Sequence, residues 1–252
     1  MLAAMSHLPI GLQLYTVRDS MEKDVGETLA AVADIGFTHV ELAGLNGLTP
    51  DSFKALLDEH KLTAIAAHDG WALDGNLATA VSTAKIIGYD YVMQPWWPED
   101  KRTAAGYGEV VSRGVAAAAE HGLTFGYHNH DFEFETLDGG GDGKTAFETL
   151  FVGTDLVCEM DTAWVAIAGH DPVAWMDKLS GRVPLLHIKD ASDFDKPTLC
   201  EVGTGKVNVK AILDNAERVG ARCLVVEQDN NWVDGDCLKS ARVSFENLKG
   251  ML

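Results

Sequence analysis

The chain has 252 residues, 46% of them hydrophobic and 23% charged, which is the ordinary composition of a soluble globular protein with a large core. Its formal net charge of -18 argues against nucleic acid and against an anionic membrane as partners, because both bind clusters of Lys and Arg. The sequence contains no signal-peptide pattern and no apolar stretch of 18 residues, so we expect a cytoplasmic protein.

Short apolar stretches alternate with longer amphipathic stretches along the whole chain. The short stretches predict strands at residues 10–17, 38–44, 63–68, 90–96, 123–130, 156–165, 183–190 and 221–230. The longer stretches predict helices at residues 25–37, 49–62, 76–88, 106–122, 144–151, 171–181, 208–220 and 237–252. Thr49 and Pro50 are typical of a helix start, and Gly36 and Gly88 are typical of helix ends.

The alternation of strands and helices predicts a parallel sheet. Eight strands in a chain of this length fit a closed (β/α)8 TIM barrel, which we expect as a single domain of residues 1–252. An open doubly wound sheet is the alternative, but residues 15–21 read YTVRDSM, without the glycine fingerprint that usually follows its first strand. Residues 137–144, rich in glycine, are predicted to form a loop after the fifth strand.

Polar and ionisable residues collect where the predicted strands end, whereas the beginnings of the strands are plain. In a TIM barrel the catalytic groups lie at the carboxyl ends of the strands. This one-sided distribution therefore predicts an active site, built from among Glu41, His68, Asp69, Gln94, His128, Asn129, His130, Glu159, Asp161, His187, Lys189, Asp190, Glu227 and Asp229.

The period of two along a strand decides which of these side chains share a face. Turning Asp161, His187 and Glu227 inward, together with His128, brings two carboxylates and two imidazoles to one level. Such a set suits a divalent metal ion; the two acids and the lack of a thiolate favour Mn, with Co, Zn, Fe and Mg as the alternatives.

A buried ion network is the other interpretation of the same residues. In that case the acids would pair with Lys189, Arg18 or His68 rather than with a metal ion.

The sequence resembles the sugar phosphate isomerase/epimerase superfamily, the xylose isomerase-like TIM barrels. The resemblance covers nearly the whole chain and implies a metal-dependent enzyme that acts on carbohydrates or polyols. It rests on the order and spacing of GLQLYTVRD, GFTHVELAG, YHNHDFEF, CEMDTAWVAIAG, LLHIKD, GTGKVNVKAIL and VVEQDN.

The resemblance implies a metal site with an acid on the fifth strand, Asp on the sixth, His on the seventh and Glu on the eighth. The matching positions are His128, Asp161, His187 and Glu227. His128 departs from the pattern, because many members have glutamate there; a histidine keeps a ligand but changes the acid–base chemistry. The segment HIKD is also similar to inosose dehydratases and enzymes of keto-glycosides, which implies that Lys189 contacts a substrate oxygen.

Four residues are predicted to be catalytic. Glu227 is the expected general base, and His128 or His130 would carry the second proton, since a histidine titrates near pH ~6.5. Lys189 would stabilise the oxyanion of an enediolate. The alternative role for His130 is to orient a metal ligand.

Four further residues are predicted to bind substrate. Trp96 and Trp164 could stack on a sugar, or pack in the core instead. His68 at the end of the third strand is a candidate contact. Arg18, just after the first strand, could hold a substrate oxygen or phosphate, with surface pairing as the alternative.

The leading functional prediction is a sugar or keto-polyol isomerase or epimerase that works through an enediolate. A dehydratase or keto-glycoside lyase shares the first step, and a catalytically inactive sugar-binding barrel is the alternative from another class. An endonuclease is disfavoured by the net charge of -18. We expect a small-molecule sugar or polyol as the partner, phosphorylated or free, and no nucleic acid or membrane. The resemblance makes a homodimer or homotetramer the usual assembly.

Overall fold

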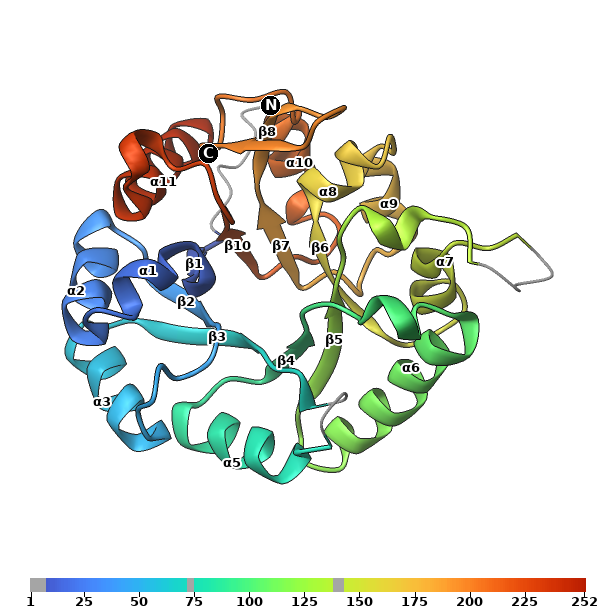
Figure 1. Ribbon diagram of the computed structural model, residues 1–252, viewed down its shortest axis with the longest axis horizontal. Coiled ribbons are helices and arrows are strands. Elements are labelled where there is room, and N and C mark those ends of the chain that lie inside the picture. Colours follow the sequence, from blue (N-terminus) through green and yellow to red (C-terminus); the bar gives the residue numbers. More distant parts are fainter. Residues whose placement is uncertain (1–7, 72–74, 138–142) are drawn as a thin grey trace.

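The computed structural model describes residues 8–71, 75–137 and 143–252, which form a closed barrel of parallel strands surrounded by helices (Figure 1). Around the barrel the strands follow chain order, and β10 closes the ring by pairing with β1. The predicted TIM barrel is confirmed, and the open sheet was wrong. The barrel strands are β1 (Ile10–Gln13), β2 (His39–Leu42), β3 (Thr63–His68), β4 (Tyr91–Gln94), β5 (Thr124–His128), β6 (Val157–Asp161), β7 (Leu185–Ile188) and β10 (Cys223–Val226).

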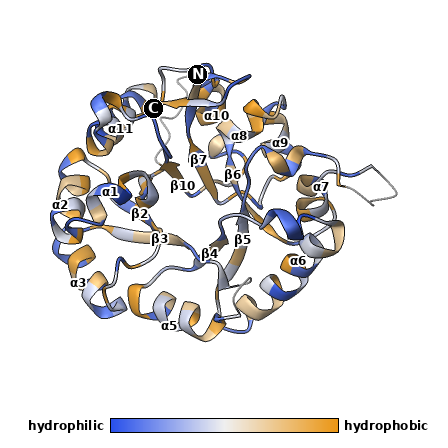
Figure 2. Ribbon diagram, viewed as in Figure 1, coloured by the Kyte–Doolittle hydropathy of each residue, from blue (hydrophilic) through white to orange (hydrophobic). Residues whose placement is uncertain are grey.

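The helices cover the outside of the barrel, and their hydrophobic residues face the strands. In α2, for example, the buried residues include Leu29, Val32 and Ile35, at the predicted helical spacing. Figure 2 shows hydrophobic strands such as β7 and β10 inside a ring of helices of mixed hydropathy. The helices are α1 (Arg18–Met21), α2 (Val25–Ile35), α3 (Pro50–Glu59), α5 (Leu77–Ile87), α6 (Ala104–Ala119), α7 (Ala146–Phe151), α8 (Thr162–Ile167), α9 (Pro172–Lys178), α10 (Val209–Ala216) and α11 (Cys237–Met251).

The predicted helix boundaries rest on local chemistry that the structure shows directly. The side chain of Thr49 accepts a hydrogen bond from the backbone N–H of Ser52 at 3.2 Å, and Pro50 is the first residue of α3. Gly36 follows α2 with a φ of 119°, in the left-handed region that glycine adopts readily. Residues 138–142 of the predicted glycine-rich loop lie outside the described residues.

Seven of the eight predicted strands are shorter in the structure, and in two of them hydrogen bonds of a side chain explain the early end. The first ends at Gln13, and Leu14–Val17 form the 3-10 helix η1, because the Gln13 side chain accepts a hydrogen bond from the N–H of Tyr15. The sixth ends at Asp161, whose carboxylate accepts from the N–H groups of Ala163 and Trp164 and so caps α8.

An additional antiparallel hairpin, which the sequence did not predict, follows β7. It consists of β8 (Asp190–Asp193) and β9 (Thr198–Cys200). No helix in the described ranges is both long enough and apolar enough to span a bilayer.

The interior of the barrel changes from apolar to ionisable along the strands. Nearer the amino-terminal ends, inward-facing residues form a separate hydrophobic cluster that includes Leu185 and Val225. Two residues further along the same strands come His187 and Glu227, which face the same way because side chains alternate across a strand. The polar layer therefore lies on an apolar floor and faces the carboxyl-terminal mouth of the barrel.

Candidate active site

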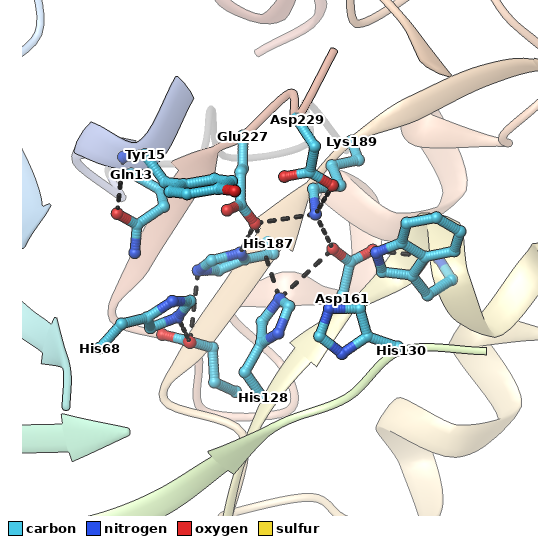
Figure 3. A network of polar contacts seen from close by, with 12 residues as sticks. Gln13, Tyr15, His68, His128, His130, Asp161, His187, Lys189, Glu227 and Asp229 are labelled. Atoms are coloured by element: carbon cyan, nitrogen blue, oxygen red, sulfur yellow. Dashed lines mark hydrogen bonds and ion pairs between the residues drawn. The ribbon is translucent and has the colours of Figure 1, made fainter. Parts of the chain in front are cut away.

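A cavity of about 480 Å³ opens at the carboxyl-terminal ends of the strands. Polar side chains from several strands converge on its floor (Figure 3). This is the position of the active site in TIM-barrel enzymes. The cavity is lined by Tyr15, Ala43, His68, Pro95, Trp96, His128, His130, Lys189, Glu227 and Asp229.

The structure brings together the four residues proposed from sequence as a metal site. One donor atom from each of His128, Asp161, His187 and Glu227 lies within 4.8 Å of the other three. Nδ1 of His187 is 2.7 Å from Oε2 of Glu227, and Nε2 of His128 is 3.4 Å from Oδ2 of Asp161. All four side chains are buried. Their nitrogen and oxygen donors suit a divalent cation of the first transition row.

Polar atoms without hydrogen bonds in this cluster also fit a cation. Both ring nitrogens of His128 and Oδ2 of Asp161 are buried without a hydrogen bond to another described residue, and Oδ2 has only ion contacts, 3.1 Å from Lys189 and 3.4 Å from His128. Buried polar atoms are normally paired, because leaving them unpaired costs free energy. A metal ion held by these atoms would satisfy them.

Lys189 provides the positive charge of the site in the structure itself. Its Nζ lies 2.9 Å from Glu227, 3.0 Å from Asp229 and 3.1 Å from Asp161. Burial favours a lower pKa for Lys189, but the three carboxylates outweigh burial and raise its pKa well above the usual value. The group is therefore an ammonium ion at neutral pH. Part of the ion network considered as an alternative is thus present.

Glu41 and Glu159 form a deeper layer of carboxylates in the barrel. Both were expected at strand ends, but neither had a predicted role. Oε2 of Glu41 is 2.7 Å from Nε2 of His187, and Oε2 of Glu159 is 2.7 Å from Nε2 of His68. Both acids are fully buried. Glu159 precedes Asp161 by two residues and pairs in register with Leu185, so it lies one layer further into the barrel. Burial, with the charge of Glu159, raises the pKa of Glu41 to about 7.

The ring of His187 lies between Glu41 of the deeper layer and Glu227. Its Nδ1 faces Glu227 and its Nε2 faces Glu41. Burial favours a lower pKa for His187, but the nearby carboxylates outweigh it and raise the pKa well above the usual value. A cation at Nδ1 would displace one ring proton, while Nε2–H still donates to Glu41; such carboxylate–histidine pairs orient metal ligands.

Asn129 follows β5 directly and is hydrogen-bonded to the backbone of Asp161, the candidate metal ligand at the end of β6. Its Oδ1 accepts a hydrogen bond from the N–H of Asp161 at 3.0 Å, and its Nδ2 donates to the backbone oxygen of Asp161 at 3.3 Å. The side chain is fully buried. Asn129 therefore faces away from His128 and holds the backbone at which Asp161 leaves the strand.

Glu133 supports the segment that carries the histidines, from behind the cavity. Its carboxylate accepts hydrogen bonds of 2.6 Å from the hydroxyl of Tyr127 and from the backbone N–H of His130. The side chain is fully buried, and burial raises its pKa to about 7 although both donors favour the charged form. A buried carboxyl with these donors makes Glu133 a structural residue of the site.

The pKa of Glu133 predicts a pH-dependent stability. An unfolded glutamate titrates near 4.5 and the folded one near 7, so between these values the unfolded chain releases a proton that the folded chain keeps. The free energy of unfolding should therefore fall as pH rises through this window, by roughly 3 kcal/mol from this group. Urea unfolding is measured at about pH 5, 6 and 7 with a chelator present. The free energy of unfolding should fall less steeply with pH in Glu133→Gln than in the unmodified protein. Parallel curves for the two proteins would contradict the assignment.

The predicted site residues occupy three kinds of position. Six of them line the cavity, namely His68, Trp96, His128, His130, Lys189 and Glu227, and two form the buried floor, namely Asp161 and His187. Trp164 lies behind the wall, with its ring centroid 5.9 Å from that of His130. Arg18 does not line the cavity; it stacks on Tyr15 at 4.2 Å and donates to the backbone oxygen of Asp229 at 2.7 Å.

Tyr15 and Asp229 also line the cavity, but Tyr15 was not predicted to belong to the site and Asp229 was predicted only as one of the polar residues at strand ends. Tyr15 was assigned to a strand, whereas η1 turns its ring to the cavity. Asp229 lies two residues beyond Glu227, and this alternation is the signal that could have assigned it a role in the cavity wall.

Solved structures share this fold over nearly the whole chain. A sugar phosphate isomerase/epimerase from Parabacteroides distasonis ATCC 8503 has a TM-score of 0.80 and 24% identity, covering 95% of this chain and 97% of that chain. The probable 3-DHS dehydratase of Bacillus anthracis, involved in petrobactin synthesis, has a TM-score of 0.71 and 12% identity, covering 96% and 99%. An AP endonuclease, family 2, from Brucella melitensis has a TM-score of 0.70 and 17% identity, covering 92% and 96%.

These comparisons confirm the resemblance at the level of the fold. No protein-family model matches the chain, and no curated protein matches its sequence. The structural neighbours include an isomerase/epimerase, a dehydratase and an endonuclease, so the fold alone does not choose the reaction.

Proposed function

We propose that this protein is a metal-dependent isomerase or epimerase of a sugar or keto-polyol, working through an enediolate. The supporting observation is that Glu227, Lys189 and the four-residue candidate metal cluster meet at the floor of one cavity. A base, a fixed positive charge and a cation site are the groups that proton abstraction next to a carbonyl requires.

The ion would be held by His128, Asp161, His187 and Glu227, with Mn as the preferred metal. When bound, it would supply a Lewis acid that polarises the substrate carbonyl. Two carboxylates among the four donors offset its charge, and the cavity above leaves room for substrate oxygens.

Glu227 is the proposed general base. Burial favours a higher pKa for this carboxyl, but Lys189 and His187 outweigh burial and hold its pKa well below the usual range. The side chain is therefore ionised at neutral pH and ready to take a proton from the carbon beside the carbonyl. Lys189 would donate a hydrogen bond to the oxyanion that forms.

His130 is the proposed carrier of the second proton. Burial, reinforced by neighbouring His128, lowers the pKa of His130 well below its usual value, so the ring is neutral. A neutral imidazole could relay the second proton, taking one on one nitrogen and giving one up from the other. Nδ1 of His130 is buried without a hydrogen bond to the described residues. His128 is less suited to this role, because we assign its nitrogen to the metal.

A dehydratase or lyase is the second candidate, because the ammonium of Lys189 lies beside the base. With Nζ 2.9 Å from Glu227, a charged hydrogen-bond donor that could stabilise a leaving oxygen lies next to the group that removes the proton. One of the structural neighbours is a probable dehydratase. The first step is common to both reactions.

Proton exchange in D2O distinguishes these functions. Protein loaded with Mn²⁺ is incubated with keto sugars and keto-polyols, and the recovered compounds are analysed by mass spectrometry and NMR. Deuterium beside the carbonyl, in substrate or epimer, is the expected result; release of water or an alcohol would indicate the lyase. A protein that takes up no metal and exchanges no proton would be the inactive sugar-binding barrel. The control is an Asp161→Ala, His187→Ala double variant, which should lose the metal.

A further inference from the structure

The cavity has no positive charge to spare for an anionic substrate. Lys189 is the only lysine or arginine among the described residues that line it, and its ammonium already faces three carboxylates. With the proposed divalent ion bound, one ammonium and one cation balance Asp161, Glu227 and Asp229, while His187 and His68 are paired with Glu41 and Glu159 at 2.7 Å. The carboxylate of Asp229, with 23% of its side chain exposed, lies in the wall. A phosphate group entering the cavity would be repelled by the carboxylate of Asp229. Among the described lining residues it would find no lysine or arginine free to pair with it.

Two arginines that contact residues of the site, Arg18 and Arg102, are engaged in other interactions. Arg18 stacks on the rings of Tyr15 and Trp232 and donates to two backbone oxygens, those of Tyr15 and Asp229. Arg102 stacks on Phe132, its guanidinium carbon 3.4 Å from the ring centroid. All 20 lysines and arginines lie in the described part of the chain, since residues 1–7, 72–74 and 138–142 contain none.

The loop that could bind phosphate through its backbone is filled by a carboxylate of the chain. TIM barrels often bind phosphate with N–H groups of the loops after the seventh and eighth strands. Here the N–H groups of Gly203 and Gly205 both donate to Oδ2 of Asp190 at 2.9 Å, and that of Val207 donates to Oδ1 at 3.0 Å. A Cβ on Gly205 would lie 2.2 Å from Oδ1 of Asp190, so glycine is needed there to admit the carboxylate.

The remaining features of the cavity suit an uncharged sugar. Tyr15 and Trp96 line it with 45% and 48% of their surfaces exposed, and aromatic faces pack well on the C–H faces of a sugar ring. His130 also lines the cavity, and its Nδ1 has no hydrogen bond to the described residues. A neutral imidazole can bond a hydroxyl.

We propose that the cavity accepts an uncharged, unphosphorylated sugar or polyol and rejects its phosphate esters. The proposal rests on the proposed function for the position of the substrate, but charge selection can be measured without turnover. Like charges brought together in a site weaken binding, and a cost of about 1.4 kcal/mol already lowers the affinity about tenfold.

Matched pairs of ligands test the charge selection directly. Calorimetric titrations of the Mn²⁺-loaded protein, without free metal, use D-fructose, D-xylulose and myo-inositol, each beside its own phosphate monoester. We expect the neutral members to bind and every ester to bind at least about tenfold more weakly. An ester that binds as tightly as its parent, or inorganic phosphate that displaces a bound sugar, would overturn the proposal. If no proton exchange occurs, the proposed reaction fails, while the binding ratio still decides the charge selection.

An Asp229→Asn variant tests the origin of the selection. Removing the charge of Asp229 should strengthen binding of the ester more than binding of its parent. The ratio of their dissociation constants should therefore fall. A ratio unchanged by the substitution would overturn the electrostatic explanation. Circular dichroism and metal content, measured alongside, show that the variant is folded and loaded.

Discussion

Replacement of Glu227 by glutamine is expected to lower kcat/KM by about 10²–10⁴-fold, the range typical of a lost general base. The amide cannot accept the proton from carbon, although it has nearly the same shape as the carboxylate. Because the same residue is a proposed metal ligand, activity is measured over a series of Mn²⁺ concentrations and taken at saturation. Deuterium exchange into the substrate should fall by the same factor, since it reports the proton transfer alone.

An exposed glutamate provides the matched control for this prediction. Glu109 lies on α6, pairs with Arg113 and has 49% of its side chain exposed, so Glu109→Gln makes the same chemical change far from the cavity. Its kinetic constants should match those of the unmodified protein. Full turnover by Glu227→Gln at saturating Mn²⁺ would show that another group removes the proton.

The sequence alone is enough to predict the site residues whose position follows from the alternation of side chains along a strand. His187 and Glu227 each lie two residues beyond apolar inward-facing residues of the same strand, so the period of two is enough to place them. Asp161 was placed by the same alternation, although the residue two positions before it is Glu159 rather than an apolar one and the predicted strand was too long. The strand ends at Asp161 because the carboxylate of Asp161 accepts hydrogen bonds from the first N–H groups of α8. The alternation of side chains up to Asp161 is not affected.

The contacts across the barrel could not be predicted in this way. Glu41 on β2 meets His187 on β7, and His68 on β3 meets Glu159 on β6, in each case between strands that are not neighbours in the ring. Such pairs depend on how the sheet closes, which no local pattern records. The same holds for Asp190, whose carboxylate accepts hydrogen bonds from the backbone N–H groups of Gly203, Gly205 and Val207.

Replacement of Lys189 by methionine is expected to reduce the free energy of unfolding of the metal-free protein by about 3–5 kcal/mol. Methionine has a similar volume, but it leaves the carboxylates of Asp161, Glu227 and Asp229 without the ammonium that now lies 2.9–3.1 Å away. Two of these carboxylates belong to the candidate metal cluster, so a bound cation should take over part of the pairing. We therefore expect Mn²⁺ to restore more stability to Lys189→Met than it adds to the unmodified protein.

Urea unfolding with a chelator and with saturating Mn²⁺ measures both parts of this prediction. Lys210→Met is the control, because Lys210 pairs with Asp214 on the surface with 60% of its side chain exposed. It should cost less than about 1 kcal/mol and respond to Mn²⁺ as the unmodified protein does. If the loss in Lys189→Met were the same with and without Mn²⁺, the cation would not lie at Asp161 and Glu227. These acids would then serve a buried ion network, and the proposed reaction would lose its metal.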